Sequence, residues 1–124
     1  QLLQIFDIFD RGFVTYSNEA KIDCLGVPIS LINQFGAVSE QVAKVMAEGT
    51  LANSNAHLSL SVTGIAGPGG GTEQKPVGLV CIGSALAHSD TIVETHTFSG
   101  GRDTVRNKAV AQAITILNRQ AQTF

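Results

Sequence analysis

Cysteine, charge and long apolar runs are all in short supply in this chain of 124 residues. Its two cysteines, Cys24 and Cys81, allow one disulfide at most, too few to hold together a small secreted fold. No apolar run approaches the roughly 20 residues that a membrane-spanning helix needs, and no basic-then-apolar signal sequence opens the chain. Charged residues make up 15% of the chain and the net charge is −2, which gives no sign of a nucleic-acid binder's basic patch. These absences predict a cytoplasmic protein that binds neither membranes nor nucleic acid.

Apolar residues, in contrast, make up 44% of the sequence, which excludes a disordered tail. The length fits a single domain over residues 1–124. The scarcity of charge leaves two interpretations open. Either some of the surface is buried in a larger assembly, or the chain is a compact monomer whose surface is rich in Ser, Thr, Asn and Gln.

Apolar patterns predict strands that alternate with helices. Leu58, Leu60 and Val62 alternate with serine and threonine, which is typical of a strand with one buried face. Ser39 is a candidate N-cap for the helix that follows it. The predicted strands are 12–17, 58–63, 77–87 and 91–98, and the predicted helices are 18–25, 40–51 and 103–120. Because the last two strands form a hairpin, this order predicts an α/β fold with helices packed on a mixed β-sheet.

A predicted strand-to-helix turn separates Tyr16 and Lys21 by five positions, so that both side chains could face one pocket. A lysine with a lowered pKa in a desolvated pocket is able to act as a general base for a serine. The alternative is that Lys21 is a solvated residue on the surface of a short helix. Spacing alone favours this second interpretation.

Two glycine-containing loops are candidate binding sites. In the loop after Thr63, residues 64–71, successive backbone N–H groups can cradle an anion or a carbonyl oxygen, although the Gly-Lys-Ser/Thr of a P-loop is missing. The alternative is a flexible structural crossover. At 99–103, a helix N-terminus beside Arg102 suits a phosphate. The same residues could instead cap the helix, with Arg102 paired to Asp103 or to another carboxylate.

Other catalytic signals are weak. The three histidines lack metal-ligand spacing, so no metal is expected. Both cysteines lie in apolar contexts that favour buried thiols over nucleophiles. No Gly-x-Ser-x-Gly elbow occurs in the sequence. The residues by themselves therefore indicate a base and an anion site without an evident nucleophile.

Five motifs in register carry a resemblance to a known family. They are Arg-Gly-Phe-Val-Thr-Tyr-Ser-Asn-Glu-Ala-Lys at 11–21, Gly-Ala-Val-Ser-Glu at 36–40, Thr-Gly-Ile-Ala-Gly-Pro-Gly-Gly-Gly at 63–71, Lys-Pro-Val-Gly at 75–78 and Gly-Arg-Asp-x-Val-Arg at 101–106. Together they closely resemble the CinA C-terminal-domain family, the bacterial nicotinamide mononucleotide deamidases.

The resemblance implies a three-layer α/β/α fold with a mixed β-sheet. It also implies a serine/lysine amidohydrolase that uses no metal or cofactor and converts nicotinamide mononucleotide to nicotinic acid mononucleotide and ammonia. Carried over by motif, the catalytic residues are Lys21 and Tyr16. The substrate-binding residues are Thr63, Gly64, Gly67, Gly69, Gly70 and Arg102.

The family's catalytic serine lies in an upstream Ala-Glu-Ser-Cys-Thr-Gly-Gly segment that does not occur in these 124 residues. The expected protein is therefore a family member truncated at its N-terminus, inactive by itself, that binds nicotinamide mononucleotide or a similar phosphorylated small molecule. The alternative is a non-catalytic nucleotide-binding or competence/damage-inducible interaction domain. Since a missing strand leaves a sheet edge unpaired, we also expect a homo-oligomer in which a partner or the N-terminal segment covers this edge.

Overall fold

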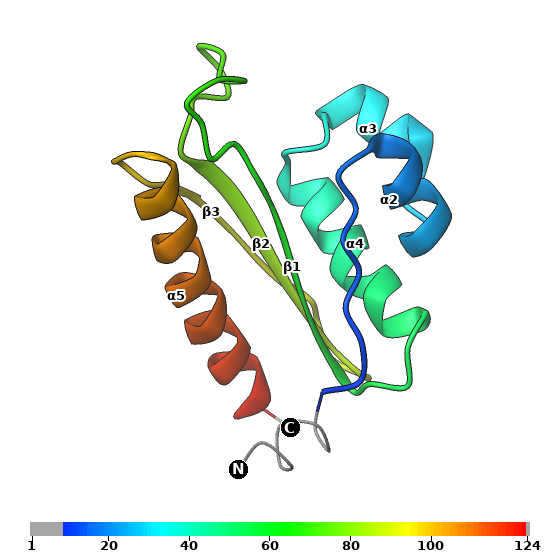
Figure 1. The fold of residues 1–124 in the computed structure, drawn as a ribbon. Helices are drawn as coiled ribbons and strands as arrows, with labels where there is room; N and C mark the ends of the chain where they lie inside the picture. Colours follow the sequence, from blue (N-terminus) through cyan, green and yellow to red (C-terminus); the bar gives the residue numbers. More distant parts are fainter. Residues whose placement is uncertain (1–8, 124) are drawn as a thin grey trace.

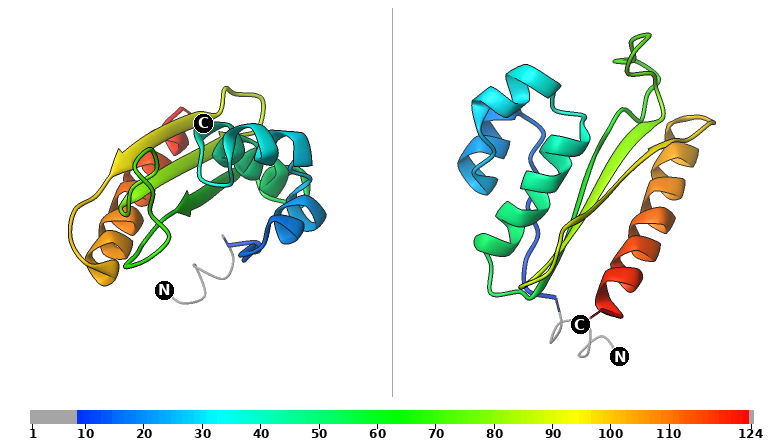
Figure 2. Two further views of the ribbon diagram at one scale, coloured as in Figure 1. Left: turned by 90° about the horizontal axis from the view of Figure 1, so that it is seen from above. Right: turned by 180° about the vertical axis from the view of Figure 1, so that it is seen from behind.

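The computed structural model describes residues 9–123, which form three layers (Figure 1). Three strands make a sheet in the order β1-β2-β3. One long helix, α5, covers one face of the sheet, and α4 covers the other face, with α2 and α3 packed against α4 (Figures 1 and 2). The predicted three-layer α/β/α architecture is therefore confirmed. The elements are α2 Asn18–Leu25, α3 Ile29–Phe35, α4 Glu40–Ala52, β1 Leu58–Gly64, β2 Leu79–Leu86, β3 Ile92–Thr97 and α5 Arg102–Ala121.

The sheet differs from the expected mixed sheet. β2 lies in the centre and pairs with both β1 and β3, and both pairings are antiparallel. The strand predicted over 12–17, which would have preceded a crossover helix, does not form. These residues are extended, but no strand within residues 9–123 lies beside them, and Val14 is 81% exposed. The sheet that the structure describes is therefore entirely antiparallel.

Residues 9–16 instead run along α4 towards α2. Arg11 donates from Nη1 to the Asn53 carbonyl oxygen (3.2 Å), which fixes one end of the segment near the end of α4. Phe13 packs against the apolar cluster that α2, α3 and α4 share. Side-chain contacts, and not backbone hydrogen bonds to a neighbouring strand, therefore hold this segment against α4.

The predicted N-cap of α4 and the predicted end of α2 are both confirmed. Ser39 Oγ accepts the backbone N–H of Val42 (3.2 Å) at the start of α4, as predicted. α2 ends at Gly26, whose φ of 69° is the left-handed conformation that glycine adopts without strain. Helix α3 was not predicted, because seven residues between Pro28 and Gly36 are too few to show a helical period.

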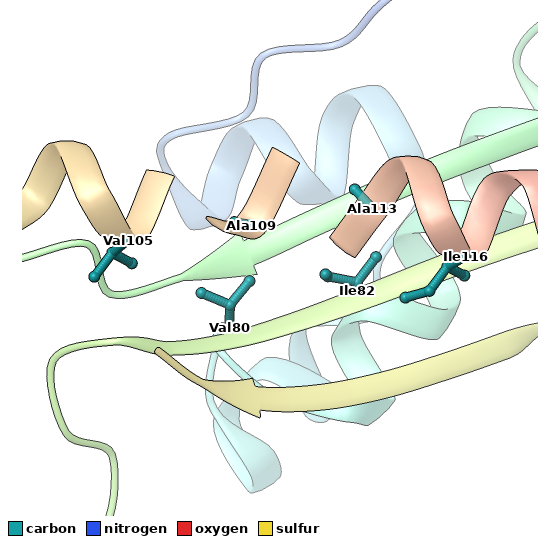
Figure 3. Close-up of a cluster of buried hydrophobic side chains, with 6 residues drawn as sticks. All are labelled: Val80, Ile82, Val105, Ala109, Ala113 and Ile116. Carbon is teal, nitrogen blue, oxygen red and sulfur yellow. The ribbon is translucent and has the colours of Figure 1, made fainter. Parts of the chain in front are cut away.

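The core on the α5 face is apolar, as the sequence predicts. Val80 and Ile82 of β2 point towards a stripe of small and branched side chains on α5 (Figure 3). This stripe consists of Val105, Ala109, Ala113 and Ile116, all of which are buried. None of the helices within residues 9–123 combines the length and the hydropathy that a membrane span requires.

The core on the α4 face is polar along β1, which reverses the predicted burial. Ser59, Ser61 and Thr63 are buried against α4, whereas Val62 is 45% exposed. Ser59 Oγ and Ser61 Oγ each donate to a helix carbonyl oxygen, those of Ala47 and Ala43, at 2.6 Å. The backbone of α4 lies so close to the sheet that only short side chains fit, and their hydroxyls are satisfied by the helix itself.

Candidate functional site

Arg102 begins helix α5 and reaches across to the glycine-rich loop. Its Nη1 donates to the carbonyl oxygen of Gly67 at 2.9 Å. From the sequence, Arg102 could instead have paired with Asp103, but in the structure it contacts the backbone of Gly67. Gly101, the N-cap of α5, provides no side-chain cap, so the first N–H groups of the helix remain available to an external acceptor.

The glycine-rich loop extends beyond the ends of β1 and β2. The Ile65 N–H donates to the Leu79 carbonyl oxygen (2.9 Å) and the Gly78 N–H to the Ile65 carbonyl oxygen (2.7 Å), which closes the base of the loop. At the tip, a Cβ atom added to Gly69 would have no neighbour within 4 Å. Gly70 has a positive φ of 90°. The tip is therefore open backbone whose N–H groups can approach a ligand closely.

Thr63 anchors the turn between α3 and α4, together with two other side chains. Three successive carbonyl oxygens of this turn accept hydrogen bonds: that of Phe35 from Lys75 Nζ, that of Gly36 from Ser39 Oγ (2.8 Å) and that of Ala37 from Thr63 Oγ1 (2.9 Å). Thr63 is thus committed as a donor and retains only its acceptor capacity for a ligand. Sequence reasoning gave no role to Lys75, the first residue of the 75–78 motif, which joins the segment after the glycine-rich loop to the end of α3.

Lys21 is buried on α2, with 6% of its surface exposed. Its Nζ donates to the carbonyl oxygen of Thr15 at 2.7 Å. Burial lowers the pKa of the Lys21 ammonium group from its ordinary value, because leaving water disfavours the charged form. The alternative of a solvated surface lysine is therefore wrong.

Tyr16 does not accompany Lys21. Its side chain is 92% exposed, so it points into solvent, while the lysine amine is held by the backbone of Thr15. The expectation that both side chains face one pocket rested on a strand-to-helix turn. Because residues 12–17 do not pair as a strand, that turn has a different shape and Tyr16 turns outward. The structure described here gives Tyr16 no contact with the amine.

The buried amine predicts a measurable pH dependence of stability. Between the lowered pKa of Lys21 in the folded protein and its ordinary value of 10.5, the unfolded chain binds more protons than the folded one. The free energy of unfolding therefore rises with pH across this window. Lys21→Met removes the titrating group, and we expect urea denaturation at a series of alkaline pH values to show a flatter profile. Lys44→Met, at an exposed position of α4, is the control and should keep the original slope.

Neither cysteine has the environment of an activated nucleophile. Burial raises the pKa of the Cys81 thiol, which disfavours the reactive thiolate. Cys24 is exposed, which corrects the prediction that both thiols are buried. Residues 9–123 contain no group of three or more His, Cys, Asp or Glu side chains that could share a metal ion.

The predicted site residues lie at one end of the molecule, although they are not all in contact. β1 ends, and α2, α4 and α5 begin, at the upper end in Figure 1, where the glycine-rich loop projects. Arg102 and Gly67 are joined directly, and Lys75 joins the segment after the loop to the end of α3. Lys21 belongs to α2, which packs against α4 and not against the sheet. Two surface hollows around residues 88–91 lie near the opposite end and contain none of the predicted site residues.

The arrangement is that of an α/β/α domain with a candidate anion site beside the first turn of its last helix. Comparison with known proteins agrees with this fold. The model of the CinA C-terminal domain matches residues 4–121. The chain therefore belongs to the CinA C-terminal domain family.

Curated relatives include competence-damage inducible proteins and nicotinamide-nucleotide amidohydrolases. A "Putative competence-damage inducible protein" of Caldicellulosiruptor bescii is 50% identical over 114 residues, which is 92% of this chain and 28% of the relative. The "Nicotinamide-nucleotide amidohydrolase PncC" of Escherichia coli K12 is 49% identical over 112 residues, 90% of this chain and 68% of the relative. The chain thus spans about a quarter of the first relative and two thirds of the second.

Solved structures have the same fold. The competence/damage inducible protein CihA from Agrobacterium tumefaciens superposes with a TM-score of 0.87 at 44% sequence identity, covering 89% of this chain and 67% of that one. A CinA superfamily protein from Escherichia coli superposes with a TM-score of 0.80 at 33% identity, covering 91% of this chain and 63% of that one.

Proposed function

We propose that this chain is the substrate-holding part of a nicotinamide-nucleotide amidohydrolase. The reaction would be hydrolysis of the carboxamide of nicotinamide mononucleotide to nicotinic acid mononucleotide and ammonia. Identity of 49% with a relative of that name supports the substrate class. The observation that carries the proposal is the contact between Arg102 and Gly67, since it brings a guanidinium, open glycine N–H groups and an uncapped helix N-terminus together.

In this proposal the 5′-phosphate binds at Arg102 and the start of α5. A fixed phosphate positions the distant carboxamide, so part of the catalytic rate comes from binding energy at the remote end of the substrate. The glycine-rich loop contributes N–H groups that stabilise the negative charge developing on the amide oxygen. The ligand then spans the upper end of the sheet in Figure 1.

Lys21 is the proposed general base. A neutral amine can donate one proton to the Thr15 carbonyl oxygen and still offer its lone pair to a serine hydroxyl. The serine would attack the carboxamide carbon, expel ammonia and form an acyl-enzyme, which water would then hydrolyse. The resemblance assigns this serine to a segment upstream of the matched motifs, so these 124 residues are expected to bind the nucleotide without turnover.

Binding and ammonia release test this proposal on the 124-residue chain. At a concentration 100 times the dissociation constant, nicotinamide mononucleotide should stabilise the fold by about 2.7 kcal/mol. Nicotinamide riboside, which lacks the phosphate, should give a much smaller shift. Denaturation curves measure both. Absence of a shift with the mononucleotide contradicts the proposed ligand, and steady ammonia release contradicts the expected lack of turnover.

A second candidate is a non-catalytic nucleotide-binding or interaction domain. It is favoured by the relatives named competence-damage inducible, of which this chain matches only 28% of the length. The two candidates differ for a chain extended with an upstream Ala-Glu-Ser-Cys-Thr-Gly-Gly segment. Such a chain should release ammonia from the mononucleotide if the first proposal is right, and should only bind it if the second is right. Either function would operate in the cytoplasm.

A further inference from the structure

β3 is an edge strand of the sheet, and within residues 9–123 only β2 pairs with it (Figure 3). Its register with β2 runs from Ile92 to Thr97 without a bulge, and the strand contains no proline and no lysine. Proteins usually protect an edge strand with one of these devices or with a covering segment. The outer side of β3 is therefore able to accept another strand.

The backbone groups on the outer side of β3 follow from a hydrogen bond at its end. The Phe98 N–H donates to the Gly78 carbonyl oxygen (2.8 Å), so Phe98 directs its backbone polar groups towards β2. Successive residues of an antiparallel strand alternate in this direction. Val93, Thr95 and Thr97 therefore direct their N–H and C=O groups away from β2, towards the open side.

The residues from Ile92 to Phe98 form a self-complementary sequence. Antiparallel pairing of two copies centred on Thr95 would place position 92 opposite 98, position 93 opposite 97 and position 94 opposite 96. Isoleucine then meets phenylalanine, valine meets threonine, glutamate meets histidine and threonine meets threonine. Apolar pairs, hydroxyl pairs and pairs of an acid with a base all stabilise neighbouring strands, and no like charges lie opposite each other. Such self-complementarity is what a two-fold contact between identical chains requires, so it favours a second copy as the partner.

The acid and the base of this sequence are held in place on the α5 face. Arg119 Nη1 donates to Glu94 Oε2 (2.5 Å), and His96 Nε2 lies 2.8 Å from Glu94 Oε1. Hydrogen bonds from Arg119 and His96 lower the pKa of the Glu94 carboxyl group, so it is ionised at neutral pH. The His96 ring stacks on that of Phe98, with 5.4 Å between the ring centroids. Glu94 and His96 are therefore ordered side by side before any second strand arrives.

We propose that two copies of this chain pair through β3 about a two-fold axis at Thr95, which would give one continuous sheet through both copies. The layers leave room for this arrangement. Strands in a sheet lie about 4.8 Å apart, and both α4 and α5 pack mainly over β2 and β1. The two copies of either helix would therefore lie at least about 14 Å apart, beyond the 8–10 Å typical of packed helices. Since strand pairing makes most of the contact, we expect a weak and reversible dimer.

Sedimentation velocity of the 124-residue chain from about 1 to 200 μM tests the proposal. Thr95→Lys should raise the dissociation constant of the dimer at least about tenfold, because the two-fold axis would place two ammonium groups side by side. Thr95 is exposed, so the fold should be retained, which circular dichroism checks. Asn118→Lys adds the same charge at an exposed position of α5 and is the matched control, which should leave the dissociation constant within about twofold.

A mixture of two variants tests the position of the axis. Thr95→Lys and Thr95→Glu should each be monomeric alone, because each brings like charges together. An equal mixture of the two should form a dimer, because opposite charges then meet at position 95. A loss of dimer caused only by damage to the fold would not be rescued in this way.

Amide hydrogen exchange on the unaltered chain provides a measurement that needs no variant. Protection of the Val93, Thr95 and Thr97 amides should increase with protein concentration, whereas the Glu94 and His96 amides, which already face β2, should not change. A monomer at the highest concentration overturns the proposal. So does a dimer that leaves these three amides unchanged or is insensitive to Thr95→Lys, and so does a mixture of the two variants that stays monomeric. Because nucleotide binding is measured separately, failure here does not bear on the proposed function.

Discussion

Replacement of Gly83 by valine should lower the free energy of unfolding by about 3 kcal/mol, the upper end of the usual cost of overpacking a core. A Cβ atom at this position of β2 would lie 2.7 Å from the Ala43 carbonyl oxygen and 2.8 Å from Ser61 Oγ. Relief requires α4 to move away from the sheet, which would lengthen the hydrogen bond from Ser61 to Ala43. Urea denaturation with a circular dichroism readout measures the loss.

Gly69→Ala is the matched control for Gly83→Val. A Cβ atom at Gly69 meets nothing within 4 Å, and its φ lies outside the positive range. We expect its effect on the free energy of unfolding to be within about 0.5 kcal/mol, as for other surface substitutions. If Gly83→Val were as stable as Gly69→Ala, the close approach of α4 to the sheet would be wrong.

Arg102→Ala should weaken binding of nicotinamide mononucleotide by about 1–3 kcal/mol, which is roughly a 5- to 150-fold rise in the dissociation constant. The substitution removes both the guanidinium proposed to bind the phosphate and the hydrogen bond that holds Gly67. Titration calorimetry on the 124-residue chain measures the change. Nicotinamide riboside should be affected much less, because it has no phosphate.

Arg106→Ala is the control, because Arg106 is an exposed residue one turn further along α5. It removes the same charge from the same helix and should change the affinity less than threefold. Arg102→Lys should recover only part of the affinity, since an ammonium lacks the planar fork of a guanidinium. Unchanged binding by Arg102→Ala would rule out the phosphate site.

The elements with strong local signals could be predicted from the sequence. The N-cap at Ser39, the stop at Gly26 and the apolar stripe of α5 depend on residues close together in the chain, so they could be identified without knowing the fold. The hairpin of β2 and β3 has the same local character. Helix α3, between Pro28 and Gly36, is the exception: it was not predicted, because it is too short to show a helical repeat of apolar residues.

Features that depend on distant backbone could not be predicted in the same way. Alternation in β1 indicates two different faces, but only the approach of α4 decides that the face of Ser61 is the more deeply buried one. The orientation of the Tyr16 side chain likewise depends on whether residues 12–17 form a strand, and that requires a pairing partner elsewhere in the molecule. For the candidate site, the motifs identified Arg102 and the glycine-rich loop separately, and their direct contact through Gly67 emerged only in three dimensions.

The hydroxyl contacts between β1 and α4 fix the position of the helix along the strand. Two residues of a strand advance about 6.6 Å, and four residues of a helix advance about 6.0 Å, so the step from Ser59 to Ser61 nearly matches the step from Ala47 to Ala43. A purely apolar contact would allow the helix to slide along the strand, whereas each serine hydroxyl here donates to one particular carbonyl oxygen. These two bonds therefore prevent α4 from sliding along β1. They also fix the distance between the first turn of α4 and the end of β1, where the glycine-rich loop begins.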